Sequence, residues 1–142
     1  MATKTVSMSF TGISQVTGTI YIGYRKAIGE FRDALQKEMA IEKKEVVQRT
    51  PKDTGELRKS VKVTMGDRKK NSVSASITAG GNNINPKTKK PTSEYAAIVH
   101  EGLDTNFRVG QAKYIESVLR ESAPHMTARV KRRVDVGRIF NK

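Results

Sequence analysis

The sequence predicts an α+β domain in which an antiparallel sheet of about four strands packs with one long N-terminal helix and one C-terminal helix. Three observations predict this class. Short segments place apolar residues at alternate positions, residues 19–49 repeat apolar residues in steps of three and four, and the same helical spacing returns from residue 111. At 142 residues the chain suits a single domain covering residues 1–142.

The predicted strands are short. Residues 5–11 alternate apolar and polar side chains and predict a first strand. Residues 57–65 and 73–79 repeat this alternation on either side of a polar turn, which predicts an antiparallel hairpin. The apolar run EYAAIVHE at residues 94–101 suits a strand or a helical turn by periodicity alone, and we expect a strand that closes the sheet.

The predicted helices are amphipathic. In the long helix, Glu38 falls on the polar side and Glu42 in a mixed-charge turn near the end, so we expect both in solvent. Pro51 ends the pattern, because the residue before a proline disfavours helical geometry. The C-terminal helix is expected to be kinked at Pro124, which lacks an N–H and crowds the preceding turn.

Composition excludes several classes of function. The chain has no cysteine, which excludes disulfides, thiolate zinc sites and thiol nucleophiles. It has no apolar N-terminal run typical of a signal peptide and no stretch near the roughly 20 apolar residues that span a bilayer. We therefore expect no membrane association. Residues 80–93 are rich in Gly, Pro, Asn and Lys, which predicts a flexible, protruding loop.

The residue types that carry catalysis or bind metals are sparse. His100 adjoins Glu101, but a zinc site needs three or four convergent ligands, and we interpret His100 as a polar strand end at a subunit contact. His125 is expected to face solvent. Asp53 and Glu56 lie in a Gly-containing turn, where a backbone-bonding role outweighs acid–base work. We predict no catalytic residue, metal or cofactor, and keep a hydrolase using Asp53 or His100 as a third, minor hypothesis.

Charge is the strongest compositional signal. The chain has 27 Lys and Arg against 14 Asp and Glu, a formal net charge of +13 that attracts polyanions. A sequence-nonspecific nucleic-acid-binding protein is therefore the alternative function, and it predicts salt-sensitive binding. The candidate contacts to DNA or to an acidic partner are Lys87, Lys89, Lys90, Arg129, Lys131, Arg132 and Arg133, the last four in a basic C-terminal tail.

The segment TPKDTGELRKS at residues 50–60 joins the long helix to the first hairpin strand. Pro51 breaks the helix, Asp53 and Thr54 are suited to bonding freed backbone groups, and Gly55 permits a positive φ that turns the chain. Physical reasoning alone predicts a tight helix-to-strand corner.

This segment resembles the Pro-x-Asp-Thr-Gly-x-Leu-x-x-Ser motif of the head-to-tail joining proteins of tailed bacteriophages, also called neck, tail-completion or minor tail proteins. Two further segments are similar to the family in the same order: residues 95–102, YAAIVHEG, and residues 112–115, AKYI. The residues that carry the first motif are Pro51, Asp53, Thr54, Gly55, Leu57 and Ser60. Those that carry the second are Tyr95, Ala96, Val99, Glu101 and Gly102, which we expect at a subunit interface.

The resemblance implies a structural virion protein rather than an enzyme. Such proteins form a ring at the head–tail joint, connect the portal-side connector to the tail-terminator or tail-tube proteins, and leave a channel for double-stranded DNA. Six copies are favoured over twelve as the number that closes the ring. The protein is expected to be made in the bacterial cytoplasm and to reside in the virion.

Overall fold

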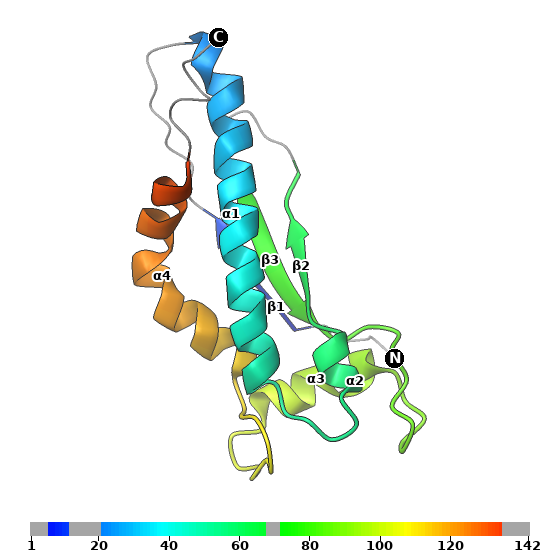
Figure 1. Ribbon diagram of the computed structural model, residues 1–142. Coiled ribbons are helices and arrows are strands. Elements are labelled where there is room, and N and C mark those ends of the chain that lie inside the picture. Colours follow the sequence, from blue (N-terminus) through cyan, green and yellow to red (C-terminus); the bar gives the residue numbers. More distant parts are fainter. Residues whose placement is uncertain (1–5, 12–20, 68–71, 135–142) are drawn as a thin grey trace.

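The computed structural model describes residues 6–11, 21–67 and 72–134, which form the α+β domain drawn in Figure 1. The predicted connection at 12–18 and the tail beyond residue 134 lie outside the described residues. The described elements, in chain order, are β1 (Val6–Thr11), α1 (Tyr21–Arg49), α2 (Glu56–Lys59), β2 (Lys62–Met65), β3 (Ser74–Ala79), α3 (Thr92–Glu101) and α4 (Tyr114–Arg133).

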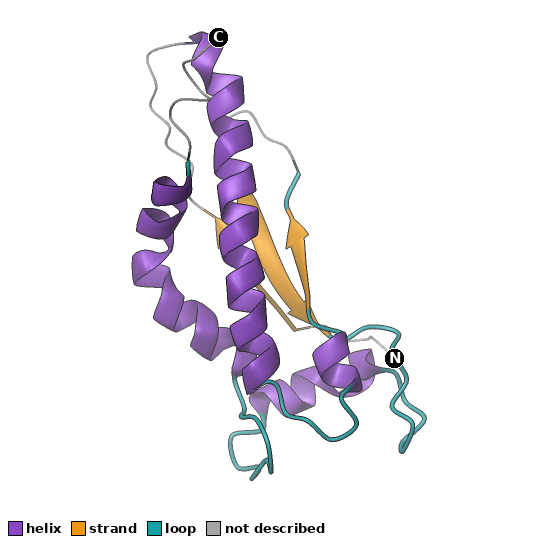
Figure 2. Cartoon of the chain, in the orientation of Figure 1, coloured by secondary structure: helices purple, strands orange, loops and turns teal. Residues whose placement is uncertain are grey.

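The sheet has three strands among the described residues, in the order β1-β3-β2, and both pairings are antiparallel. The predicted first strand and the predicted hairpin are confirmed. Along β3 the residues Ala75, Ile77 and Ala79 are buried, while the intervening hydroxyl residues are only half-buried. Helix α1 packs on β2 and β3, and α4 packs along α1 and on β1, so both helices lie on one side of the sheet (Figures 1 and 2).

One strand prediction is wrong and another is wrong in its bounds, and the missing strand leaves three strands among the described residues where four were expected. Residues 94–101 belong to α3, because Thr92, Ala96 and His100 are buried at helical spacing and one face of the segment alone meets the core. In the segment predicted as a strand over 57–65, residues Glu56–Lys59 form the short helix α2, and β2 begins only at Lys62. The long N-terminal helix and the C-terminal helix are both confirmed.

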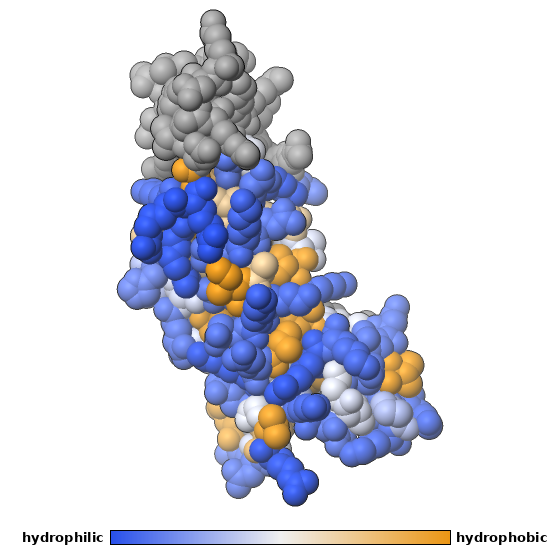
Figure 3. Space-filling view, viewed as in Figure 1, coloured by the Kyte–Doolittle hydropathy of each residue, from blue (hydrophilic) through white to orange (hydrophobic). Residues whose placement is uncertain are grey.

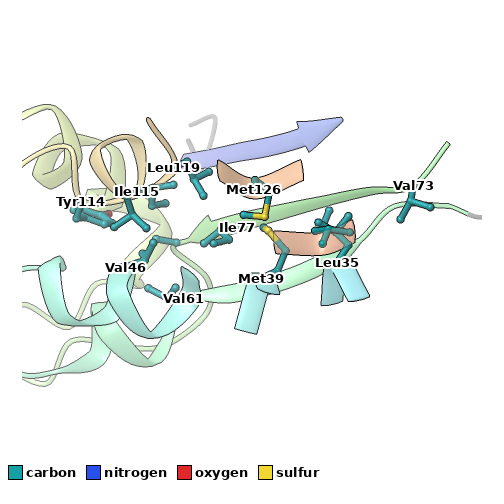
Figure 4. Close-up of a cluster of buried hydrophobic side chains, with 14 of the residues drawn as sticks. Leu35, Met39, Val46, Val61, Val73, Ile77, Tyr114, Ile115, Leu119 and Met126 are labelled. Atoms are coloured by element: carbon teal, nitrogen blue, oxygen red, sulfur yellow. The ribbon is translucent and has the colours of Figure 1, made fainter. Parts of the chain in front are cut away.

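The core lies between the two long helices and the sheet. Figure 4 shows Leu35 and Met39 of α1, Ile77 of β3 and Met126 of α4 directed toward one another. At the other end of this cluster Tyr114 is fully buried, and its hydroxyl donates a hydrogen bond to the carbonyl oxygen of Ala96 (3.1 Å). Helix α4 contains Pro124 and bends along its length in Figure 1, as expected.

The expectation that Glu38 and Glu42 are in solvent is wrong, since each carboxylate is only 2% exposed. Both lie where α1 meets α4, and α4 supplies their partners. Arg129 Nη2 donates to Glu42 Oε1 at 2.7 Å, and Arg133 pairs with Glu38. Ser122 Oγ donates to the second oxygen of Glu42. A buried carboxylate is stable only when paired and hydrogen-bonded, so this cluster fixes which face of α4 meets α1.

The substitution Arg129→Ala tests this cluster. It leaves the buried Glu42 carboxylate without its cationic partner, and removing one member of a buried pair costs about 3 kcal/mol. We expect the free energy of unfolding, measured by urea denaturation, to fall by that amount. Arg132→Ala changes an exposed residue of the same helix and serves as the matched control, with an effect within about 0.5 kcal/mol. Equal effects of the two substitutions would contradict a stabilising role for the cluster.

Candidate assembly interface

The first motif begins where α1 ends, and side chains satisfy the last carbonyl groups of that helix. Thr50 Oγ1 donates to the carbonyl oxygen of Val46 (2.7 Å). The guanidinium of Arg58 donates to the carbonyl oxygens of Thr50 (2.9 Å) and Gln48 (3.0 Å). A cation at this end also interacts favourably with the helix dipole. The helix therefore ends in a fixed position.

Gly110 holds a second loop against this helix end. A Cβ atom built on Gly110 lies 2.5 Å from the Cα of Pro51 and 2.7 Å from the carbonyl carbon of Thr50, and its φ is +93°. Two backbone hydrogen bonds flank the contact: Lys52 N–H donates to Val109 (3.1 Å), and Gln111 N–H donates to Arg49 (2.8 Å). Only glycine allows the two backbones to approach so closely in this conformation.

The remaining residues of the first motif form the predicted corner, with one change. Gly55 has a φ of +90°, which confirms its predicted positive φ. Ser60 Oγ donates to the carbonyl oxygen of Leu57 (2.6 Å) and accepts from Gly80 N–H (2.9 Å), which ties the corner to the end of β3. Asp53 is exposed and pairs with Lys87, so it bridges two loops, whereas Arg58 and Gln111 bond the freed carbonyl groups of α1.

The second motif lies on α3, and different faces of this helix carry its residues. Ala96 is buried in the core, while Tyr95 and Val99 are half-buried beside the corner. Burial raises the pKa of the Tyr95 hydroxyl, and a hydrogen bond with the Asn85 side chain acts in the opposite direction. Gly102 caps the C-terminal end of the helix.

His100 is buried inside its own chain rather than at a polar strand end, which corrects the sequence interpretation. It is 3% exposed and packs edge-on against the ring of Tyr114, with ring centroids 4.9 Å apart. Its Nδ1 lies 2.8 Å from Glu101 Oε1, and we assign the proton to Nδ1 on this contact. Lys113 pairs with Glu101, and the ammonium group, followed by His100, lowers the pKa of that carboxyl. These contacts fix α3 to the start of α4.

The two motifs meet in a groove of about 450 Å³. Helix α3, which lines it, lies at the lower end of the molecule in Figure 1. The corner contributes Pro51, Lys52, Asp53, Thr54 and Leu57, and α3 contributes Tyr95 and Val99. The loops on either side contribute Asn85, Lys87 and residues 106–109. We call this surface the motif groove. Its lining combines apolar and aromatic side chains with polar and charged ones, among them the cations Lys52, Lys87 and Arg108.

The loop predicted to be flexible at residues 80–93 forms one wall of the motif groove. Asn85 stabilises the loop by two hydrogen bonds. The Oδ1 of Asn85 accepts from the N–H of Lys87 at 2.9 Å, and the backbone N–H of Asn85 donates to the carbonyl oxygen of Lys90. Thr92 closes the base of the loop through hydrogen bonds with Gly81. The mobility of the loop stays a prediction.

The basic residues singled out from the sequence do not form one surface. Lys87 pairs with Asp53, and Lys90 lies 4.0 Å from a carboxylate oxygen of Glu94. Lys89 is exposed, with a positive φ of 59°. On α4 the cations divide: Arg129 and Arg133 bind the buried carboxylates of α1, while Lys131 and Arg132 are exposed.

Two features of this interface escaped sequence reasoning. Gly110 and Arg58 complete the corner from positions that carry no distinctive local pattern. For the close backbone contact, the only signal in the sequence was a glycine in a loop, Gly110. For the contact that caps α1, the only signal was an arginine within the motif, Arg58. Within the described part of the chain, no group of three or more His, Asp or Glu side chains is placed to hold a metal ion. Over the same residues, no helix combines the length and apolarity needed to cross a bilayer.

This arrangement, an α+β domain whose motif segments line a surface groove, is typical of a binding or assembly module. A family model matches residues 25–117, well over half of the chain, and its description is "Bacteriophage HK97-gp10, putative tail-component". The chain belongs to this HK97-gp10-like family. Membership indicates a structural, tail-related bacteriophage protein of the virion, in a family that is not one of enzymes. No curated protein and no solved structure matches the chain at the significance required.

Gly110→Ala tests the contact that positions the groove. The added methyl group meets the backbone of Pro51 and the residue is strained at a positive φ, so we expect a loss of about 2–4 kcal/mol in the free energy of unfolding. Gly29→Ala is the matched control, because nothing lies within 4 Å of its built Cβ on the exposed side of α1. That control should gain up to about 1 kcal/mol from higher helix propensity. Wild-type stability of Gly110→Ala in chemical denaturation would refute the close approach.

Proposed function

We propose that the chain is a structural virion protein that forms a ring at the bacteriophage head–tail joint. The ring connects the portal-side connector to the tail-terminator or tail-tube proteins and leaves a channel for double-stranded DNA. The single observation that carries the proposal is the motif groove, because it brings two segments that are distant in the sequence together on one surface. Family membership supplies the context of a tail-related component.

The exposed apolar residues support assembly as the activity. Five large apolar side chains of the described residues are exposed, and four of them, Ile84, Ile98, Leu103 and Val109, belong to α3 and its flanking loops. Single exposed apolar residues are ordinary on soluble domains, whereas apolar surface gathered in one region marks an interaction site. Figure 3 shows apolar surface midway along the molecule and, in separate spots, at its lower end, among hydrophilic residues. A ring with rotational closure buries such surface between identical copies, and six copies are favoured.

Removing the gene from the phage that encodes the chain tests the proposal. We expect DNA-filled heads and separate tails in electron micrographs, and restored plaque formation when the wild-type gene is supplied on a plasmid. Tails joined to heads without the protein, or purified particles in which mass spectrometry does not find it, would refute the proposal.

Complementation with single variants locates the activity. Val109→Glu places a charge at the motif groove, and Ile41→Glu places one on an exposed site of α1 of similar exposure, 46% against 41%. We expect the first to reduce plaque titre at least about tenfold and the second to leave it unchanged, since desolvating an unpaired charge at an interface weakens association. Equal titres would exclude the groove as the assembly surface.

Contact with DNA is the alternative function, and one observation favours it. Lys131 and Arg132 are exposed in the last turn of α4, and neither forms an ion pair with any residue that the structure describes. If both contact phosphates, the double variant Lys131→Gln, Arg132→Gln should reduce the slope of log affinity against log salt by about two. Fluorescence anisotropy with duplex DNA measures this slope. Lys37→Gln with Lys44→Gln on α1 is the control, and an unchanged slope in the α4 variant would remove these two residues as DNA contacts.

A further inference from the structure

We propose that copies of the chain join head to tail, with the α3 ridge of one copy seated in the motif groove of the next. The α3 ridge consists of Ile98, Leu103 and Asp104. This inference rests on the proposed function, and it identifies the two complementary surfaces and their occupant, a second copy of the same chain.

The α3 ridge is the most exposed apolar surface that the structure describes. Ile98 and Leu103 are each 72% exposed, against 41–51% for the three other exposed large apolar residues. Ile98 lies on α3 and Leu103 directly after the helix, beside its cap at Gly102. Removing two such side chains from water favours association, because burial of apolar surface drives most contacts between proteins.

The ridge and the motif groove occupy different faces of one helix. Tyr95 and Val99, one turn apart, line the groove, while Ala96 and His100 face the interior of the chain. Successive residues of a helix are rotated by about 100°, so Ile98 projects opposite the interior face and next to the face that lines the groove. None of the three ridge residues lines the groove of its own chain, so a contact between ridge and groove joins two different surfaces. A contact between two different surfaces of identical chains is heterologous, the type that generates rings.

The charges of the two surfaces favour a second copy of the chain in the groove, bound head to tail. Lys52 and Arg108 line the groove and form no ion pair with any described residue, while Lys87 is compensated by Asp53. The ridge carries Asp104, which is exposed and has no ion-pair partner among the described residues. A ridge-to-groove contact brings opposite charges together. Ridge-to-ridge and groove-to-groove contacts each bring like charges together, and such juxtaposition disfavours a two-fold dimer.

Cross-linking of mixed chains tests the inference, and the chain has no native cysteine to interfere. One chain carries Ala97→Cys next to Ile98 of the ridge, and a second, differently tagged chain carries Thr54→Cys at the groove, so that Ile98 and Lys52 are both kept. A short bis-maleimide is added to each chain alone and to the mixture, at the highest concentration at which the wild-type protein stays in solution. We expect a cross-linked dimer containing one chain of each kind in the mixture, and uncross-linked monomer for each chain alone.

Two controls make the contact specific. Ala40→Cys on α1 replaces Ala97→Cys as an alanine outside the ridge, and its mixture should give no cross-linked dimer. Adding Arg108→Glu to the groove chain should lower the yield about tenfold, equivalent to about 1.4 kcal/mol, and adding Asp104→Lys to the ridge chain should restore it. No mixed dimer, or a dimer from Ala97→Cys alone, would overturn the head-to-tail contact.

The outcome separates this inference from the proposed function. If mass spectrometry finds the protein in purified particles and the mixture gives no mixed dimer, the ridge-to-groove contact is wrong and the virion role stands. If the mixed dimer forms and the protein is absent from particles, the contact stands and the virion role is wrong.

Discussion

The end of α1 is the constraint on which the rest of the structure depends. A helix leaves its last carbonyl groups without partners inside the helix, and a buried end must find them elsewhere. Here they are satisfied by Arg58 from the corner and by the backbone of Gln111 from the loop before α4. Gly110 allows that loop to approach the backbone of Pro51 closely. Satisfying one helix end therefore brings together the corner, the loop and α3, and the motif groove is the surface that results.

A second constraint acts along the length of α1. Its buried face carries two carboxylates, and α4 must present cations and a hydroxyl group opposite them. Replacing such a cluster with apolar residues often leaves a protein equally stable, so its value lies in selecting one alignment of the two helices. Apolar packing alone would accept α4 shifted by a turn. The two carboxylates lie within the matched residues 25–117, whereas their partners on α4 lie beyond residue 117, so the cluster joins the matched segment to the part of the chain that follows it.

Local sequence patterns correctly predicted those elements whose conformation depends on neighbouring residues. The alternation in β1 and in the β2–β3 hairpin, the helical spacing of α1 and the positive φ of Gly55 each depend on a few neighbouring residues. The structure differs where the reason is distant in sequence. The pattern of α1 predicted that Glu38 and Glu42 are exposed to solvent, because their partners on α4 lie about 90 residues away in the sequence. Residues 94–101 were predicted to form a strand, because this apolar run is too short to show a clear period. Its conformation depends on the segments that pack against it, here the core around Ala96 and Tyr114.

The same distinction applies to the candidate interface. Motif resemblance singled out Pro51, Tyr95 and Val99, and the structure brings all three to one groove. The resemblance did not single out Gly110, Ile98 or Leu103. An interface depends on the shape of the surface, and that shape forms only when segments distant in the sequence pack together. Charge misled for a related reason. A net charge of +13 suggests one basic surface, but cations that neutralise carboxylates of their own chain are no longer available to a partner.

A ring built from one kind of chain needs two complementary surfaces on each copy, held at a fixed angle. Helix α3 is suited to this task because it carries a ridge on one face and a wall of the groove on another, and a single rigid element fixes the angle between them. His100, Glu101 and Lys113 fix this helix to α4, and Tyr114 anchors it to the core. In a head-to-tail ring that angle determines how far each copy is rotated from the previous one, and so how many copies close the circle. In the proposed ring, the contacts that hold α3 in place, among them those of the buried His100, therefore set the angle between ridge and groove without lying in the interface.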